Sequence, residues 1–196
     1  MIRPIYLLGN PELRGVTQDI PKDSADIQNL IDDMLETMHN ACGIGLAAPQ
    51  IGRFEKVFVI DVSNFESENE ESDHAIPDQP MVFVNSKIVE TSDSGAEFEE
   101  GCLSIPDIHE EVMRPMHVRI RYLDRHFCEQ EDSYTGMLAR VIQHEYDHLE
   151  GVLFIDHIST LRRRLLKRRL KDISAGESEA EYPVYVLGKG ALARAG

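Results

Sequence analysis

The order of apolar and polar positions predicts helices near both ends of the chain and strands between them. Residues 24–39 have a helical spacing of apolar positions. These positions are Ile27, Leu30, Ile31, Met34 and Met38. Strands are predicted at 56–62, 81–90 and 117–128. Because most strands precede two further helical segments, the pattern favours an α+β fold over an alternating α/β fold.

A second helix is predicted over 135–151, where the sequence reads TGMLARVIQHEYDHLEG, with Thr135 as its N-cap and Gly151 as its stop. His144 and His148 project from one face of such a helix, and Glu145 lies beside them. Two imidazoles can hold a metal ion while the carboxylate handles protons on its bound water. The alternative is an ordinary helix whose histidines are satisfied polar residues.

A catalytic site of this type usually has three protein ligands, so a third is needed. His157 is the candidate downstream of the helix, and Cys102 in EEGCLSIP is the candidate upstream. A thiolate is a strong ligand for a soft or borderline divalent ion. Cys42 and Cys128 have no His/Glu cluster near them and are predicted to be ordinary thiols. No CxxC pair occurs, which disfavours a Cys-rich structural zinc site.

Small residues dominate the segment GIGLAAPQIG at 43–52. It has neither the Gly-Lys-Ser/Thr of a phosphate-binding loop nor a full dinucleotide fingerprint. One interpretation is a tight turn packed against a sheet. The other is a set of backbone amides that, with the side chain of Gln50, donate hydrogen bonds to an oxyanion.

Three motifs, GIGLAAPQ, EGCLS and QHEYDHLEG, occur in this order and together resemble the peptide deformylase family. The segments PIYLLGNPELRG and GVLFIDHIS resemble it too, so the resemblance covers 1–63 and 81–173. It implies an α+β fold in which antiparallel sheets pack around a central metal-binding helix, followed here by a C-terminal helix. It also implies hydrolysis of the N-formyl group from the initiator methionine of new polypeptides, with release of formate.

The resemblance implies a role for each motif residue. Cys102, His144 and His148 would bind one divalent ion, Fe(II) in the cell, with zinc, nickel or cobalt in purified protein. Glu145 would be general base and acid while water activated by the metal attacks the formyl carbon. Gln50 and the backbone N–H of Leu103 would stabilise the oxyanion, and Gly45 would supply backbone contacts to the substrate.

An apolar pocket for the methionine side chain is also implied. Ile44, Met137 and Val141 are the predicted lining residues, and the alternative is that they are simply core. Glu100 and Arg114 flank the Cys102 loop with opposite charges, so they could pair and hold it in place. Solvated charges are the alternative for this pair.

Composition and charge limit the class of protein. The chain has 196 residues, 42% of them hydrophobic, and a net charge of −15, as expected for one globular domain. No apolar run approaches the ~20 residues of a membrane span. An odd number of cysteines, three, favours a reducing cytoplasm. We expect a single catalytic domain at 1–174, with an acidic loop insertion at 66–80. A polar, flexible tail is expected at 175–196, within which PVYVL could form an edge strand.

Seven of the ten residues from Arg162 to Lys171 are Arg or Lys. A partial apolar stripe predicts an amphipathic helix whose basic face could meet RNA phosphates. The stripe comprises Ile158, Leu161, Leu165 and Ile173. The expected partners are therefore nascent formyl-Met polypeptides and the ribosome, with no membrane and no DNA. A solvated basic helix is the alternative.

Two other functions fit part of the pattern. A zinc-dependent peptidase would use His157 in place of Cys102 as the third ligand. A non-catalytic protein would use the site as a structural metal clamp, or the basic helix as an RNA-binding module. A structural clamp would need neither Glu145 nor Gln50, and the combination of these two residues with the Cys102 loop ranks the deformylase first.

Overall fold

The computed structural model describes residues 1–63 and 79–193, so the acidic segment expected at 66–80 lies almost wholly outside the described residues. The main helices are α1 (Ala25–Asn40), α2 (Gly136–Leu149) and α3 (Thr160–Ser174), with short 3-10 helices η1 (Pro11–Arg14), η2 (Ala48–Ile51) and η3 (Phe154–Asp156). Within the described ranges, no helix is both long and apolar enough to cross a membrane.

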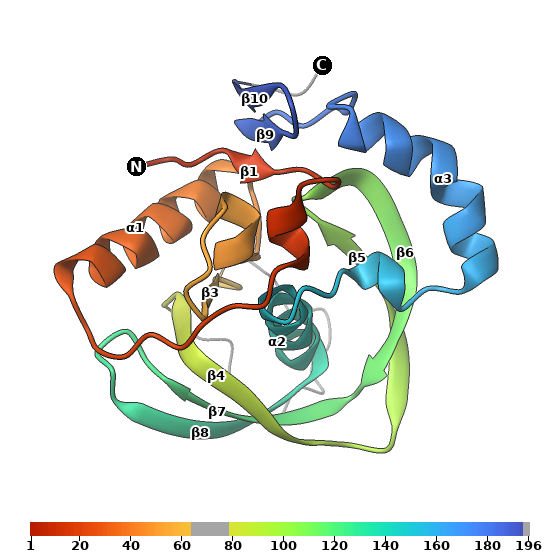
Figure 1. The fold of residues 1–196 in the computed structure, drawn as a ribbon. Helices are drawn as coiled ribbons and strands as arrows, with labels where there is room; N and C mark the ends of the chain where they lie inside the picture. The colour runs from red at the N-terminus through yellow and green to blue at the C-terminus, as the bar shows by residue number, and fades with distance from the viewer. Residues whose placement is uncertain (64–78, 194–196) are drawn as a thin grey trace.

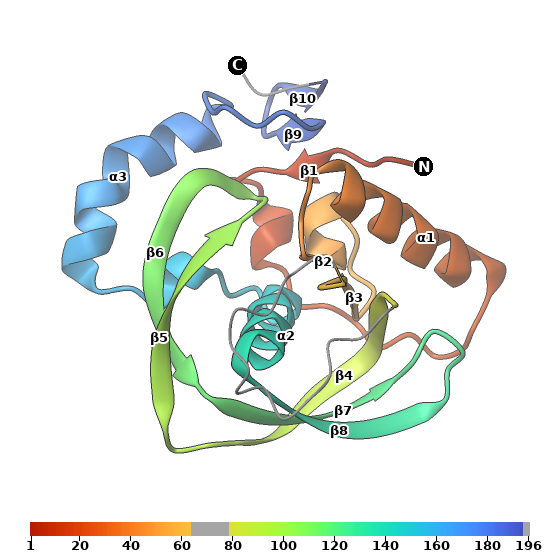
Figure 2. The ribbon, with the colours of Figure 1, turned by 180° about the vertical axis from the view of Figure 1, so that it is seen from behind.

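The described residues form three sheets, and α2 lies near the centre of the molecule in both ribbon views (Figures 1 and 2). The five-stranded antiparallel sheet has the order β2 (Gly45–Ala47), β3 (Val57–Ile60), β4 (Met81–Thr91), β7 (His117–Leu123) and β8 (Glu129–Thr135). A long hairpin is formed by β5 (Gly95–Cys102) and β6 (Ile105–Pro115). In the third sheet, β1 (Ile5–Tyr6) pairs in parallel with β9 (Val184–Val186), which pairs antiparallel with β10 (Gly190–Leu192).

The expected α+β class and the central helix are confirmed. The predicted strands at 56–62 and 81–90 correspond to β3 and β4, but the strand predicted at 117–128 ends at Leu123. There the side chain of Asp124 accepts hydrogen bonds from the backbone N–H groups of His126 and Cys128 at 2.8 and 3.0 Å, which turns the chain into β8. The β5–β6 hairpin was not predicted.

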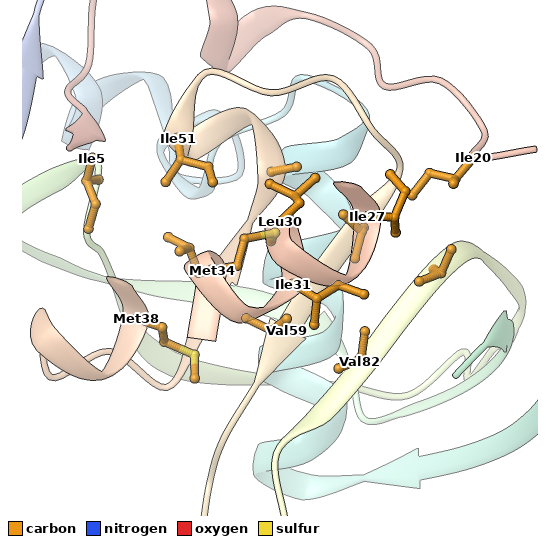
Figure 3. Close-up of a cluster of buried hydrophobic side chains, with 14 residues drawn as sticks. Ile5, Ile20, Ile27, Leu30, Ile31, Met34, Met38, Ile51, Val59 and Val82 are labelled. Carbon is orange, nitrogen blue, oxygen red and sulfur yellow. The ribbon is translucent and has the colours of Figure 1, made fainter. Parts of the chain in front are cut away.

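Helix α1 is fixed at its start by Ser24, whose hydroxyl accepts a hydrogen bond from the N–H of Ile27 at 3.3 Å. Its apolar side faces β3 and β4, as the close-up of this core shows (Figure 3). Ile31 and Met34 are fully buried there beside Val59. The helical spacing in the sequence therefore predicted both the helix and its buried face.

Helix α2 is buried on nearly every side, because different elements cover its two faces. Leu138, Val141 and Ile142 pack in one cluster with Phe58 and Phe83 of the five-stranded sheet. The rings of these two phenylalanines stack at a centroid distance of 4.6 Å. The polar residues of α2 lie on its other side. Because the helix is buried, their positions are fixed.

The C-terminal part differs from its prediction in two respects. Helix α3 lies at the periphery of the molecule (Figure 1). Ile158 and Ile173 of the predicted stripe pack inward, but Leu161 and Leu165 are exposed, and Leu166 and Leu170 pack inward in their place. The tail expected to be flexible instead contains β9 and β10, and Val184 and Val186 of β9 are buried. PVYVL does supply a strand, but β9 lies between β1 and β10 and is not the predicted edge strand.

Candidate active site

Three side chains that can bind a metal converge between α2 and the end of β5. Their ligand atoms, from Cys102, His144 and His148, all lie within 4.8 Å of one another. The sulfur of Cys102 lies 3.3 Å from Nε2 of His148. Both histidines are buried and Cys102 is half-buried. One thiolate and two imidazoles form a donor set suited to a single borderline divalent cation.

The protonation of the two histidines fits a metal site. Burial lowers the pKa of His148 well below its usual value, which keeps the imidazole in its neutral, metal-binding form. Burial also opposes a charge on His144, but Cys102 and Glu100 raise the pKa of His144 to about 10. A bound cation would take the place of this proton beside Cys102 and Glu100.

Glu100 orients His144 and connects it to two arginines. Its carboxylate accepts hydrogen bonds from Nδ1 of His144 at 2.9 Å, from Arg114 at 2.7 and 3.0 Å and from Arg140 at 2.9 Å. Burial alone would raise the pKa of Glu100, but the bonds from His144 and Arg114 hold it well below its usual value. The predicted pairing of Glu100 with Arg114 is confirmed, and Nε2 of His144 is left for a metal ion.

Glu145 is buried beside the donor group, and its Oε2 has no hydrogen-bond partner among the described residues. Burial, which outweighs the opposing effect of His144, raises the pKa of Glu145 to about 7. A Cβ on Gly45 would lie 2.8 Å from Cγ and Cδ of Glu145, so only glycine lets β2 approach this carboxylate so closely. A buried carboxyl with this pKa can both accept and donate a proton near neutral pH.

Gln50 reaches the site from η2. Its Oε1 accepts a hydrogen bond from the backbone N–H of Ala47 at 2.8 Å, which fixes the orientation of the side-chain amide. Its Nε2 then faces the Cys102 loop, 3.6 Å from the sulfur and 3.4 Å from Oγ of Ser104. The segment 43–52, expected to be either a tight turn or a source of hydrogen bonds to an oxyanion, thus places an amide N–H beside the metal-binding residues.

A cavity of about 680 Å³ opens onto these residues. Its lining includes His144, Glu145, Gln50, Cys102, Leu103 and Gly45. The three predicted pocket residues also line it: Ile44, the exposed Met137 and the buried Val141. The structure therefore brings the predicted site residues together: all but His148 line this cavity, and His148 is a buried member of the donor group.

His157 does not join the donor group. Its Nε2 lies 2.7 Å from the carboxylate of Asp147, which also accepts a hydrogen bond from Arg114 at 2.7 Å. The cluster of possible metal ligands found in the described ranges contains Cys102 in its place. Cys42 and Cys128 are exposed free cysteines outside that cluster, as expected for ordinary thiols.

Sequence reasoning missed several residues that support the site. Arg140 lies one turn before His144 on α2, so the helical spacing contained a signal for its contact with Glu100. Asp147 also lies on α2, next to His148. Tyr182 lines the cavity from the C-terminal segment, 79 residues from its partner Leu103, and no local pattern pointed to it.

A Cys-His-His donor set beside a buried carboxylate, held by an α+β fold, fits the class of small hydrolases that use one metal ion. The family model for polypeptide deformylase matches residues 2–164. The chain is 54% identical to the peptide deformylase of Salinibacter ruber, covering 94% of each chain. It is 48% identical to that of Cytophaga hutchinsonii, covering 93% of this chain and 96% of the relative.

Solved structures agree with this match. The peptide deformylase of Ehrlichia chaffeensis superposes with a TM-score of 0.79 at 33% identity, covering 88% of this chain and 96% of that one. That of Legionella pneumophila superposes with a TM-score of 0.77 at 37% identity, covering 88% and 95%. The chain belongs to the peptide deformylase family, enzymes that remove the formyl group from N-terminal methionine.

Proposed function

We propose that Cys102, His144 and His148 hold the catalytic metal ion of this deformylase and that Glu145 is its general base and acid. The observation that carries the proposal is the convergence of three buried or half-buried donors beside a buried carboxylate, one oxygen of which has no partner among the described residues. A structural metal clamp would not need such a carboxylate at the wall of a cavity. The site is therefore interpreted as catalytic.

When bound, the metal would lower the pKa of water and polarise the formyl oxygen. Glu145 accepts the proton of the attacking water and later donates it to the leaving amine, for which a pKa of about 7 is suited. The burial that raises this pKa also removes competing water from the carboxylate. The attacking water supplies the oxygen of formate and the proton of the free amine.

Negative charge develops on the formyl oxygen as the carbon becomes tetrahedral. We assign its stabilisation to the Nε2–H of Gln50 and the backbone N–H of Leu103, donors that matter more in the transition state than in the ground state. The hydrogen bond from Ala47 to Oε1 of Gln50 supports this role, because the donor is oriented before substrate binds.

We propose that the substrate peptide lies along β2. This strand lies at the edge of its sheet, and Gly45 lines the cavity, so its backbone is available to an extended peptide. Ile44, Met137 and Val141 would then surround the methionine side chain on the apolar part of the cavity lining. A flexible thioether side chain fits such an irregular apolar surface.

The ion in the cell is proposed to be Fe(II). One thiolate with two imidazoles suits iron, zinc, nickel or cobalt, and the anionic sulfur moderates the Lewis acidity of each. The same thiolate makes the centre sensitive to oxidation, so purification in air should favour protein loaded with nickel, cobalt or zinc. Residues 1–174 are proposed to form the main part of the catalytic domain, to which residues 179–182 add a wall of the cavity. The cytoplasm is proposed as the location of the protein.

The test is to incubate a short formyl-Met peptide with anaerobically prepared, iron-loaded protein and to follow the mass of the peptide. Loss of the formyl group alone is expected. Cys102→Ser should abolish turnover and metal retention, whereas Cys42→Ser, which removes a thiol from the same cavity lining, should preserve both. Cleavage of a peptide bond, or activity that survives Cys102→Ser and requires His157, would support the peptidase instead.

We also propose that the ribosome is a partner through α3. Arg162 and Arg163 are held by Glu110 and Asp156, whereas Arg164, Lys167 and Lys171 form no ion pair with any described residue. These three side chains could neutralise RNA phosphates without breaking ion pairs to other described residues.

Replacement of Arg164 and Lys167 by Ser should weaken ribosome co-sedimentation and reduce its dependence on salt concentration. Lys22 and Lys87 provide a charge-matched control, because both are exposed and lie outside α3. Equal co-sedimentation of the two double variants would rule out α3 as the docking helix.

A further inference from the structure

The C-terminal segment forms one wall of the active-site cavity. Residues 179–182 line this cavity together with Cys102 and Glu145. The segment is anchored immediately afterwards, where β9 pairs in parallel with β1 through Ile5–Val184 and Tyr6–Tyr185. In Figures 1 and 2, β9 lies directly beside β1, so a segment near the start of the chain pairs with one near its end. The wall therefore has a fixed position relative to the site.

Tyr182 makes the contact from this wall to the metal-binding loop. Its hydroxyl donates a hydrogen bond of 2.7 Å to the backbone carbonyl of Leu103, the residue after Cys102. The Tyr182 ring is half-buried and packs against both the α1 core and the cluster around Val184. Burial raises the pKa of Tyr182 above its usual value, so the hydroxyl stays protonated and can donate near neutral pH.

The loop is held at two further points by segments distant in sequence. The backbone N–H of Leu8, just after β1, donates to the carbonyl of Ser104 at 2.8 Å. Nε2 of Gln50 lies 3.4 Å from Oγ of Ser104. Cys102 itself lies where the regular β5–β6 register shifts, so the hairpin ladder alone does not set its direction. Outside contacts must define where the thiolate and the Leu103 amide point.

We infer that Tyr182 is a positioning residue of the active site. Its hydrogen bond to Leu103 fixes the turn that aims the Cys102 sulfur and the Leu103 N–H at the reacting centre. The inference rests on the proposed roles of these two residues. It also makes the C-terminal segment, at the far end of the chain from the predicted motifs, a functional part of the site.

The experiment compares Tyr182→Phe with Tyr185→Phe. Each variant removes one hydroxyl from the same segment, but among the described residues the Tyr185 hydroxyl makes no hydrogen bond, and its ring stacks on Tyr6 in a way that phenylalanine can retain. The measurements are kcat and KM on a formyl-Met peptide, the melting temperature, and the thiolate-to-metal absorption of the cobalt-loaded protein.

Tyr182→Phe should lower kcat by about 10-fold to 100-fold, the usual effect of removing a partner that orients a metal ligand, with KM within about twofold. Its cobalt absorption should shift, because the direction of the sulfur changes. Tyr185→Phe should match the parent protein in kcat and in spectrum. Similar melting temperatures for the two variants would separate positioning from a loss of folding.

Two results would overturn the inference. The first is a Tyr182→Phe protein with the kcat and cobalt spectrum of the parent. The second is a variant whose kcat falls only in step with its melting temperature, while its spectrum stays unchanged. A parent protein that does not deformylate the peptide would contradict the proposed function instead, and the cobalt spectra would still report whether Tyr182 orients the sulfur.

Discussion

Glu100 forms ion pairs with several buried side chains at the site. Arg114 and Arg140 both donate to it, and their side chains are 4% and 6% exposed. Glu100→Gln keeps the shape but leaves two buried guanidinium groups without a full counter-charge. We expect the free energy of unfolding to fall by about 3–5 kcal/mol in urea denaturation. The exposed Glu97→Gln on the same strand should change it by less than about 0.5 kcal/mol, and equal effects would contradict the prediction.

Asp156, which is outside the metal-binding group, should make the free energy of unfolding depend on pH. Burial would raise the pKa of Asp156, but Arg14 and Arg163 lower it below its usual value. Because the folded pKa is the lower one, the ionised carboxylate stabilises the protein above the unfolded pKa of about 3.9. The stability difference between the parent and Asp156→Asn should therefore be constant from neutral pH to about pH 5 and shrink below about pH 4.

Urea unfolding from neutral to acidic pH measures this difference. Asp19→Asn is the control, because Asp19 is exposed and forms no ion pair within the described ranges. It should leave the free energy of unfolding within about 0.5 kcal/mol of the parent at each pH. A difference for Asp156→Asn that grew as the pH fell would have the opposite sign to the expected one.

At the scale of elements, the sequence predicted those segments whose buried face is apolar. Helix α1 and strands β3 and β4 meet that condition, and they were found close to their true bounds. The β5–β6 hairpin was missed because the buried face of β6 alternates Ile108 and Val112 with Glu110 and Arg114. Polar residues at these positions are stabilised by partners on other elements, which no local pattern can reveal.

A substitution in α1 can test how tightly this helix packs against β3 and β4. Ile31 is fully buried against the cluster that contains Val59 and Val82. Ile31→Ala removes a side chain from a close-packed core and should cost about 2–5 kcal/mol of unfolding free energy. Asn29→Ala, on the exposed side of the same helix, should have little effect. Chemical denaturation of both variants measures this, and a cost for Ile31→Ala below about 1 kcal/mol would mean that α1 packs loosely.

At the scale of the whole molecule, the active site joins segments that are far apart in sequence. Cys102 lies 46 residues from His148, and Tyr182 lies 79 residues from Leu103. The spacing of His144 and His148 was visible in the sequence because one helix carries both. The choice of Cys102 over His157 was not determined by spacing and came from the family resemblance. Only the fold explains that choice, because it pairs His157 with Asp147 and places Cys102 against α2.

Because the donors come from β5 and α2, metal binding should stabilise the molecule as a whole. A metal concentration about 100-fold above Kd adds about 2.7 kcal/mol of stability. For a chain of 196 residues this raises Tm by about 5–10 °C. Calorimetry of chelator-stripped and nickel-loaded protein measures the shift.

The cysteine variants decide where that stabilisation arises. Cys102→Ser removes one of the three donors, and the Tm of this variant should respond little to nickel. Cys42→Ser should keep the full shift, because Cys42 is exposed and outside the donor cluster. If both variants kept the shift, nickel would be stabilising the fold from another site. If neither kept it, the loss could not be assigned to the Cys102 ligand, since a thiol outside the cluster would matter equally. Only the asymmetric result ties the hairpin, the central helix and the metal into one folding unit.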